Sequence, residues 1–187
     1  MWFERFADRR VADLVFLDEF GANTKMQRTH GRAAPGERVV DRVPHGHYKA
    51  ISTVAALSAG GIIASATFDG GTTAVRFVDF IRDELVPVLR EGQVVVLDNL
   101  AAHNDRRVDG LIGAAGCVVI RLPPYSPDFN PIELAISKVK TMLRKLAKRT
   151  VPDLFDAIDE ALRAVTSADA ENFIAHCGYA TMRRNTL

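Results

Sequence analysis

Two short apolar runs, each followed directly by an aspartate, constrain the fold of this chain most. Leu14–Leu17 leads into Asp18, and 93–97 leads into Asp98. Unbroken apolar runs of this length are typical of strands that are buried on both faces, as in parallel sheets covered by helices. If the two strands are parallel neighbours, both carboxylates emerge at the carboxyl edge of the sheet, where open α/β sheets bind ligands. The pattern predicts an α/β domain with an acidic site at that edge.

The rest of the chain supplies further strands and helices around these two runs. Residues 49–57 and 62–68 flank a turn with two glycines and predict an antiparallel hairpin. Thr72 or Thr73 is suited to cap a helix that runs to about Arg90. The core face of that helix is predicted from its spacing to be Phe77, Ile81, Leu85 and Val88. The other expected elements are helices at about 104–115, 131–149, 150–165 and 166–176 and a strand at 117–120. This order predicts a sheet of mixed direction flanked by helices, with extra helices at the C-terminal end.

A loop with four prolines, residues 122–131, leads into the helix at 131–149. Asn130 is suited to the N-cap and Pro131 to the first helical position. Glu133 then lies in the first turn, where two roles are open to it. Its carboxylate fits a capping box that reaches back to the backbone N–H of Asn130. It also fits the third position of an acidic cluster with Asp18 and Asp98.

Such a cluster of three carboxylates has a definite chemistry. Like charges raise one another's pKa, so the cluster is costly without cations. Oxygen ligands favour Mg²⁺ or Mn²⁺, and two such ions can clamp the attacking and leaving oxygens of a phosphoryl displacement. The alternative for Asp18 and Asp98 is an ordinary role at a strand end. Glu19 is a competing carboxylate but should point to the opposite face of the sheet, and Asp128 has the context of a turn residue.

Charge along the chain is uneven although the net charge is only +1. Residues 134–150 hold six basic side chains and no acidic one. At 100° per residue, Lys140 and Arg144 share the helix flank of Glu133, so they could lay DNA phosphates across the site. The alternative is a solvated charged face. Arg32, in the loop after the first strand, is open to the same two interpretations.

Cysteine usage and hydropathy bound the class of protein. Cys117 and Cys177 lie far apart and form no Cys-x-x-Cys pair, which disfavours a zinc site and indicates a reducing cytoplasm. The charged N-terminus is unlike a signal peptide. No apolar run approaches the roughly 20 residues that span a membrane, so no membrane partner is expected.

Three motifs together resemble the DDE transposases of the mariner superfamily, and most closely the bacterial insertion-sequence family numbered 630. The motifs are Leu17-Asp18-Glu19-Phe20-Gly21, the stretch Val96 to His103, and the stretch Pro123 to Glu133. The 34 residues between Asp98 and Glu133 match the family's usual spacing. The family's Trp shortly after the Glu is absent from Leu134-Ala135-Ile136-Ser137. The resemblance spans about Val11 to Tyr179.

The resemblance implies a ribonuclease-H-like fold with a mixed five-stranded sheet and a catalytic, metal-binding triad of Asp18, Asp98 and Glu133. It implies two Mg²⁺ or Mn²⁺ ions, and cleavage of transposon ends by water followed by attack of the 3′-hydroxyl on target DNA. His103 resembles a recurrent family histidine that could contact phosphate, although a hydrogen bond at the helix entry is an equal alternative.

The resemblance also sets expectations about organisation and partners. We expect one catalytic domain over 1–187, with its core at about 11–149, C-terminal helices at 150–178 and a basic tail at 179–187. Relatives carry helix-turn-helix modules ahead of this domain, so we expect a truncated copy or half of a split reading frame with such a partner polypeptide. A homodimer on DNA in the bacterial cytoplasm, associated with the nucleoid, is expected by analogy. The alternatives are another ribonuclease-H-like nuclease and an inactive remnant that only binds DNA.

Overall fold

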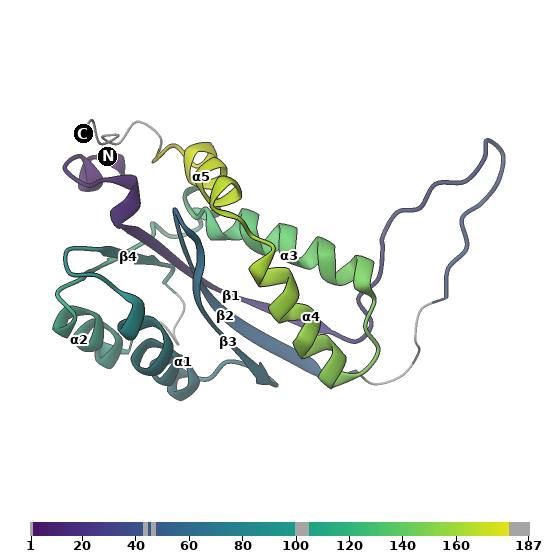
Figure 1. Ribbon diagram of the computed structural model, residues 1–187, viewed down its shortest axis with the longest axis horizontal. Coiled ribbons are helices and arrows are strands. Elements are labelled where there is room, and N and C mark those ends of the chain that lie inside the picture. Colours follow the sequence, from purple (N-terminus) through teal and green to yellow (C-terminus); the bar gives the residue numbers. More distant parts are fainter. Residues whose placement is uncertain (1, 43–44, 46–47, 100–104, 180–187) are drawn as a thin grey trace.

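A mixed five-stranded sheet forms the centre of the protein (Figure 1). The computed structural model describes residues 2–42, 45, 48–99 and 105–179. The strands are β1 (Leu14–Asn23), β2 (Ala50–Ser58), β3 (Gly61–Asp69), β4 (Val94–Leu97) and β5 (Val118–Arg121). Their order is β3-β2-β1-β4-β5. The β1–β2 and β2–β3 pairs are antiparallel, whereas β1–β4 and β4–β5 are parallel. The predicted hairpin and parallel remainder are confirmed.

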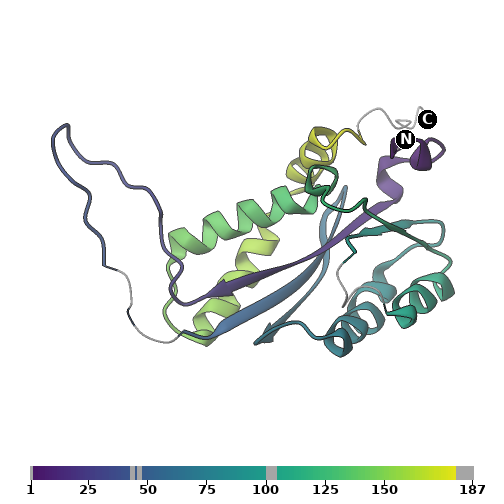
Figure 2. The same ribbon diagram turned by 180° about the vertical axis from the view of Figure 1, so that it is seen from behind.

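Helices cover both faces of this sheet (Figures 1 and 2). On one face lie α1 (Ala74–Phe80) and α2 (Arg106–Ala114). The other face carries α3 (Ile132–Leu146), α4 (Val151–Arg163) and α5 (Ser167–His176). Side-chain oxygens of Thr73, Asp105, Thr150 and Thr166 accept hydrogen bonds from backbone N–H groups in the first helical turns. These caps explain where four of the five helices begin, because they satisfy donors that the helix itself leaves unpaired.

Successive side chains of β1 point alternately into two separate halves of the core. Val15 and Leu17 are buried with the side chains of α1 and α2. Leu14 and Phe16 are buried with α3, α4 and α5. Because successive side chains of a strand point to opposite faces, Asp18 belongs to the α3 side of the sheet.

The helix that begins at Thr73 changes its winding before it ends. After α1 the chain makes a π-helical turn at Ile81–Leu85 and a 3₁₀ turn at Val86–Val88, which contains Pro87. The prediction that Val88 lies in the core is wrong, because its side chain is 46% exposed. A π turn holds an extra residue and rotates the following positions away from a regular apolar stripe. Phe77, Ile81 and Leu85 are buried as predicted.

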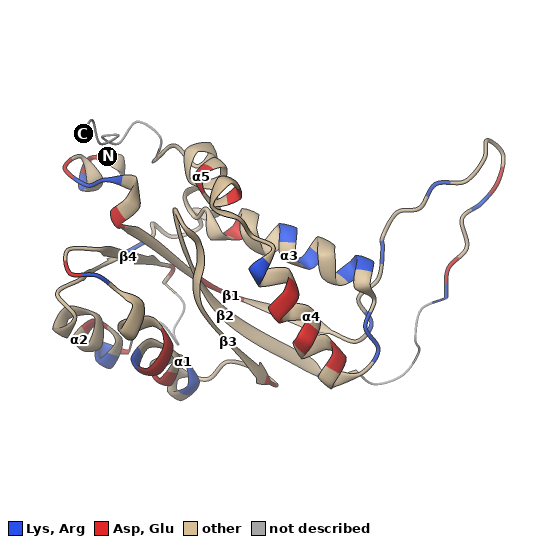
Figure 3. Cartoon of the chain, in the orientation of Figure 1, with Lys and Arg blue, Asp and Glu red and all other residues tan. Residues whose placement is uncertain are grey.

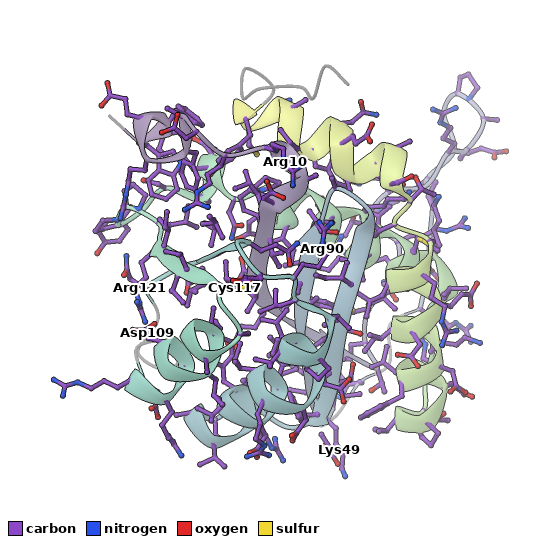
Figure 4. The ribbon with its side chains drawn as sticks, turned by 60° about the vertical axis from the view of Figure 1, so that its left-hand side comes forward. Arg10, Lys49, Arg90, Asp109, Cys117 and Arg121 are labelled. Atoms are coloured by element: carbon purple, nitrogen blue, oxygen red, sulfur yellow. The ribbon has the colours of Figure 1, made fainter. Side chains whose placement is uncertain are left out.

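Polar contacts also join the elements on the α1–α2 side of the sheet (Figure 4). Arg121 of β5 forms an ion pair of 2.9 Å with Asp109 of α2. Arg90 donates to the carbonyl of Ala12, and the thiol of Cys117 donates to the carbonyl of Arg90 at 3.1 Å. These contacts hold the amino end of β1 beside the loop that leads into β4. Within the described residues, no helix is both long enough and apolar enough to cross a bilayer.

Aromatic side chains from both ends of the chain pack together beneath the proline-rich loop. Phe6 and Tyr179 are fully buried. Trp2 Nε1 donates to the Tyr179 hydroxyl at 2.9 Å, and that hydroxyl donates to the carbonyl of Phe129 at 2.8 Å. Tyr179, the first residue of the predicted basic tail, is therefore part of the core. The other predicted domain limits stay a prediction. The sequence did not signal this cluster, because its members are brought together only by tertiary packing. Residues 180–187 lie outside the described part.

We expect Tyr179→Phe to lower the free energy of unfolding by about 1–3 kcal/mol, because the Trp2 N–H and the Phe129 carbonyl lose their buried partner. Urea unfolding followed by fluorescence measures the change. Tyr125→Phe is the matched control, since Tyr125 is fully exposed. Equal midpoints for the two variants would contradict this role of the Tyr179 hydroxyl.

Candidate active site

The pairing of β1 with β4 brings the two aspartates together. Leu14 lies opposite Val94 and Phe16 opposite Val96 in the parallel register. Continued by two residues, the same register sets Asp18 beside Asp98, on strands about 4.8 Å apart. Partners in a parallel pair point to the same face, so both carboxylates face α3. The predicted meeting of the two aspartates is confirmed, since both line one cavity. The prediction that Asp18 ends its strand is wrong, because β1 continues to Asn23 in its pairing with β2.

The third carboxylate comes from the first turn of α3. The helix begins at Ile132, one residue later than predicted, and Pro131 rather than Asn130 occupies the N-cap. The Asn130 backbone N–H donates to the Pro127 carbonyl at 2.8 Å, so it is not the partner of Glu133. The predicted cap by Asn130 and the capping-box role of Glu133 are both wrong. Glu133 instead lines a cavity together with Asp18 and Asp98.

This cavity has a volume of about 480 Å³ and opens at the carboxyl edge of the sheet. Its lining residues are Asp18, Asp98, Asn99, Leu122, Pro123, Pro124, Tyr125, Ser126, Pro127, Asn130 and Glu133. The Asn99 side-chain amide donates to the Leu122 carbonyl at 2.6 Å and so ties the end of β4 to the proline-rich loop. The loop therefore lines the cavity together with Asp18, from the middle of β1, and Asp98, which directly follows β4.

Asp18 is buried, with 7% of its surface exposed. Burial, and then the negative charge of Glu133, raise the pKa of Asp18 to about 8. The charge of Asp98 adds to this rise, whereas a hydrogen bond of 2.7 Å from the Glu19 backbone N–H opposes it. Asn130 Nδ2 donates to the other carboxylate oxygen at 3.1 Å. The site thus gathers negative charge that only a cation can neutralise without protonation.

Two residues at the cavity wall were missed as functional candidates. Asn130 was assigned to a helix cap, but its side chain contacts Asp18. Tyr125 has a φ of 54° and is fully exposed at the rim of the cavity. A positive φ is uncommon outside glycine and is often found at functional sites. The prolines on both sides of Tyr125-Ser126 are the one sequence signal that points to a special loop geometry here.

Comparison with known proteins identifies the family of this site. A family model described as "DDE superfamily endonuclease" matches residues 13–155, about three-quarters of the chain. The chain belongs to the DDE superfamily of endonucleases. The match contains Asp18, Asp98 and Glu133, but it does not test their individual roles. A search of curated proteins found no significant match.

Solved structures with a similar fold include those of the Mos1 transposase. The paired-end complex with the left transposon end matches with a TM-score of 0.73 and 16% identity, over 94% of this chain and 55% of that chain. The strand transfer complex matches with a TM-score of 0.73 and 17% identity, over 94% and 55%. The Mos1 catalytic domain matches with a TM-score of 0.64 and 14% identity, over 94% and 82%. This DDE domain thus has the predicted ribonuclease-H-like fold and spans about half the length of the transposases in those complexes.

The donor set of the DDE site fits a hard divalent cation. In the described ranges, no three His, Cys, Asp or Glu side chains converge closely enough to enclose an ion by themselves. Mg²⁺ does not need such a cage, because it commonly takes one or two carboxylates and completes its shell with water and substrate phosphates. Asp18, Asp98 and Glu133 supply carboxylate oxygens, and the buried Asn130 Oδ1 has no hydrogen-bond partner in the structure. These residues fit one or two hydrated ions.

The competing carboxylates lie elsewhere. Glu19 follows Asp18 on β1 and pairs in register with Val54, whose side chain belongs to the α1–α2 core. It therefore points away from the cavity, as predicted. Asp128 is exposed in a 3₁₀ turn at Pro127–Phe129, which confirms its assignment to a turn. Neither side chain lines the cavity.

Several basic residues lie along α3 (Figure 3). The Lys140 ammonium lies 6.0 Å from the ring centroid of Phe20, which is two residues beyond Asp18 on the same face of β1. Arg144 follows Lys140 one helical turn later. Arg32 is exposed in the segment after β1, and it is not among the residues that line the cavity. Figure 2 shows this segment extending away from the sheet. His103 lies outside the described residues.

Proposed function

We propose that this chain is the catalytic domain of a mariner-like transposase, a metal-dependent DNA endonuclease and strand transferase. One observation carries the proposal. Three acidic side chains from β1, β4 and the start of α3 line a single cavity at the carboxyl edge of the sheet. The DNA and the Mg and Mn ions named for the Mos1 structures support the same chemistry here. The narrower likeness to the insertion-sequence family numbered 630 stays a prediction.

In the proposed site, Asp18, Asp98 and Glu133 would hold two Mg²⁺ or Mn²⁺ ions. Bound there, the ions would supply Lewis-acid stabilisation of the attacking and leaving oxygens. In the first step a water oxygen bonds to phosphorus and the P–O3′ bond breaks. The departing 3′-oxygen gains a proton, which leaves a 3′-hydroxyl and a 5′-phosphate. In the second step that 3′-hydroxyl attacks a target phosphodiester and displaces another 3′-oxygen, so the number of phosphodiester bonds is conserved.

The site residues act by position and charge. The Asp18 carboxylate is fixed by the Glu19 backbone N–H and the Asn130 amide. Asn99 holds the proline-rich loop at the end of β4, which limits the space for bulk water. Aligned reactants need little reorganisation at the moment of reaction, and this lowers the barrier.

Comparison of substrates tests the function. A transposon-end duplex, an RNA–DNA hybrid and a DNA junction are incubated side by side with the protein in Mg²⁺ and in EDTA. Cleavage and joining of the DNA ends in Mg²⁺ alone supports the transposase. Preferential cleavage of the hybrid or the junction would indicate the other ribonuclease-H-like nuclease. Binding without cleavage in either metal would indicate an inactive remnant.

We further propose that Lys140 and Arg144 bind DNA phosphates along α3, and that Arg32 and His103 contribute further contacts. Replacing both Lys140 and Arg144 by Ala is expected to reduce the slope of log K against log[salt] by about 2, because each phosphate contact contributes about 0.9. Fluorescence anisotropy with labelled duplex at several salt concentrations measures this slope. Lys145→Ala is the control, since Lys145 is an exposed residue on the other flank of α3. An unchanged slope in the double variant would show that Lys140 and Arg144 do not contact DNA phosphates.

Recognition of the ends and assembly are the remaining parts of the proposal. We propose that helix-turn-helix modules on a separate polypeptide recognise the ends, and that two copies of this domain act together on DNA. Co-expression with the product of the upstream reading frame, followed by light scattering with and without end DNA, tests both points. Action at the bacterial nucleoid stays a prediction.

A further inference from the structure

Asn130 is a buried polar residue whose hydrogen bonds are incomplete. Its side chain lines the cavity and only 2% of its surface is exposed. Nδ2 donates to Asp18 at 3.1 Å, whereas the buried Oδ1 has no partner in the structure. A buried amide oxygen without a partner is destabilising. Such a group in an enzyme cavity is expected to gain a partner when the cavity is filled.

The backbone holds Asn130 firmly on both sides. Its N–H donates to the Pro127 carbonyl at 2.8 Å, and its carbonyl accepts the N–H of Glu133 at 3.1 Å. The next residue is Pro131, whose ring restricts the backbone of Asn130 to extended conformations. The observed φ of −111° and ψ of 94° agree with this restriction. The position of the amide is therefore set by the same loop that places Glu133.

The observed contact shows which end of the amide faces Asp18. The NH₂ end donates to a carboxylate oxygen, and an amide NH₂ group can only donate hydrogen bonds. The carbonyl end then remains for a donor inside the cavity. Water is a donor that fits there, and water bound to a cation is a stronger donor than free water.

We propose that Asn130 is a positioning residue that orients the Asp18 carboxylate through Nδ2 and accepts a hydrogen bond through Oδ1 from water in the hydration shell of the divalent ion. This inference rests on the proposed function. It assigns Asn130 a role around the metal that is separate from direct ligation by the three carboxylates. Groups that orient metal ligands in this way commonly contribute 10–100-fold to metal affinity.

The first test uses the wild-type chain and NMR. The side-chain NH₂ signals of ¹⁵N-labelled Asn130 are followed during titration with Mg²⁺, beside the backbone amide signals of Asp98 and Glu133. We expect the Asn130 signals to exchange slowly with solvent and to shift with the same midpoint as those of Asp98. Unchanged Asn130 signals while those of Asp98 shift would overturn the inference.

The second test measures Mn²⁺ binding by calorimetry with Asn130→Ala and Asn130→Leu, and thermal melting in EDTA verifies that each variant is folded. We expect a loss of 10–100-fold in affinity. Asn23→Ala is the control, because it removes an asparagine side chain whose Oδ1 accepts the Lys25 N–H away from the cavity. Affinity within twofold of wild type in the folded variants would overturn the inference alone. Absence of Mn²⁺ binding by the wild-type chain would overturn the proposed function and this inference with it.

Discussion

Asp98→Asn is expected to lower the rate of Mg²⁺-dependent DNA nicking by about 10³-fold. The substitution keeps the shape of the side chain but removes one of the charges proposed to hold the metal ions. Stabilisation of transition-state charge by bound ions contributes several kcal/mol, and about 4 kcal/mol corresponds to this factor. Conversion of supercoiled plasmid to nicked circles, at saturating Mg²⁺ and over a range of enzyme concentrations, measures the rate.

The matched control for this variant is Asp128→Asn. Asp128 lies in the same loop region as the site, but its side chain is exposed and does not line the cavity. It should nick DNA at the wild-type rate. Full activity in Asp98→Asn would remove the metal-dependent mechanism proposed for this cavity. Equal losses in both variants would point to a general effect of charge on DNA binding.

Asp18→Asn is expected to abolish nicking and yet to stabilise the metal-free protein at pH 8. Burial and the charge of Glu133 raise the pKa of Asp18 to about 8 in the folded state, from 3.8 in the unfolded state. Between these values the folded protein binds a proton that the unfolded chain releases. Unfolding is therefore favoured as pH rises through this range, and the carboxyl group costs stability at pH 8. Asparagine has no charge to bury, and its Oδ1 can still accept the Glu19 N–H.

Thermal melting in EDTA at several pH values measures this effect. The wild-type Tm should fall as pH rises from about 4 to 8 relative to that of Asp18→Asn. At pH 8 the variant should gain about 2 kcal/mol, or about 4–8 °C for a chain of this size. Addition of Mg²⁺ should raise the Tm of the wild type and leave the variant nearly unchanged, because a ligand stabilises only the state that binds it. A lower Tm for Asp18→Asn than for the wild type at pH 8 in EDTA would show that the Asp18 carboxyl group does not destabilise the folded protein.

The elements of this fold were largely predictable because their signals are local. The apolar runs before Asp18 and Asp98 predicted buried parallel strands, and the register of β1 with β4 agrees. Capping by Thr73 and Thr150 was predictable, since a cap acts within one helical turn. The change from α-helical to π-helical geometry after α1 was not predictable from the sequence. Val88 is exposed because the π turn breaks the regular spacing on which the prediction rested.

For the site, the sequence by itself determined which carboxylates were available and that Asp18 and Asp98 would share one sheet edge. It left Glu133 between a capping and a cavity role, and it assigned Asn130 to the wrong partner. Only the tertiary structure decided these points, because the contact between Asn130 and Asp18 joins residues 112 positions apart. The burial of Tyr179 against Phe6 was hidden for the same reason. A capping preference is a property of a few neighbouring residues, whereas the partner that a buried amide finally takes depends on which strand the fold brings beside it.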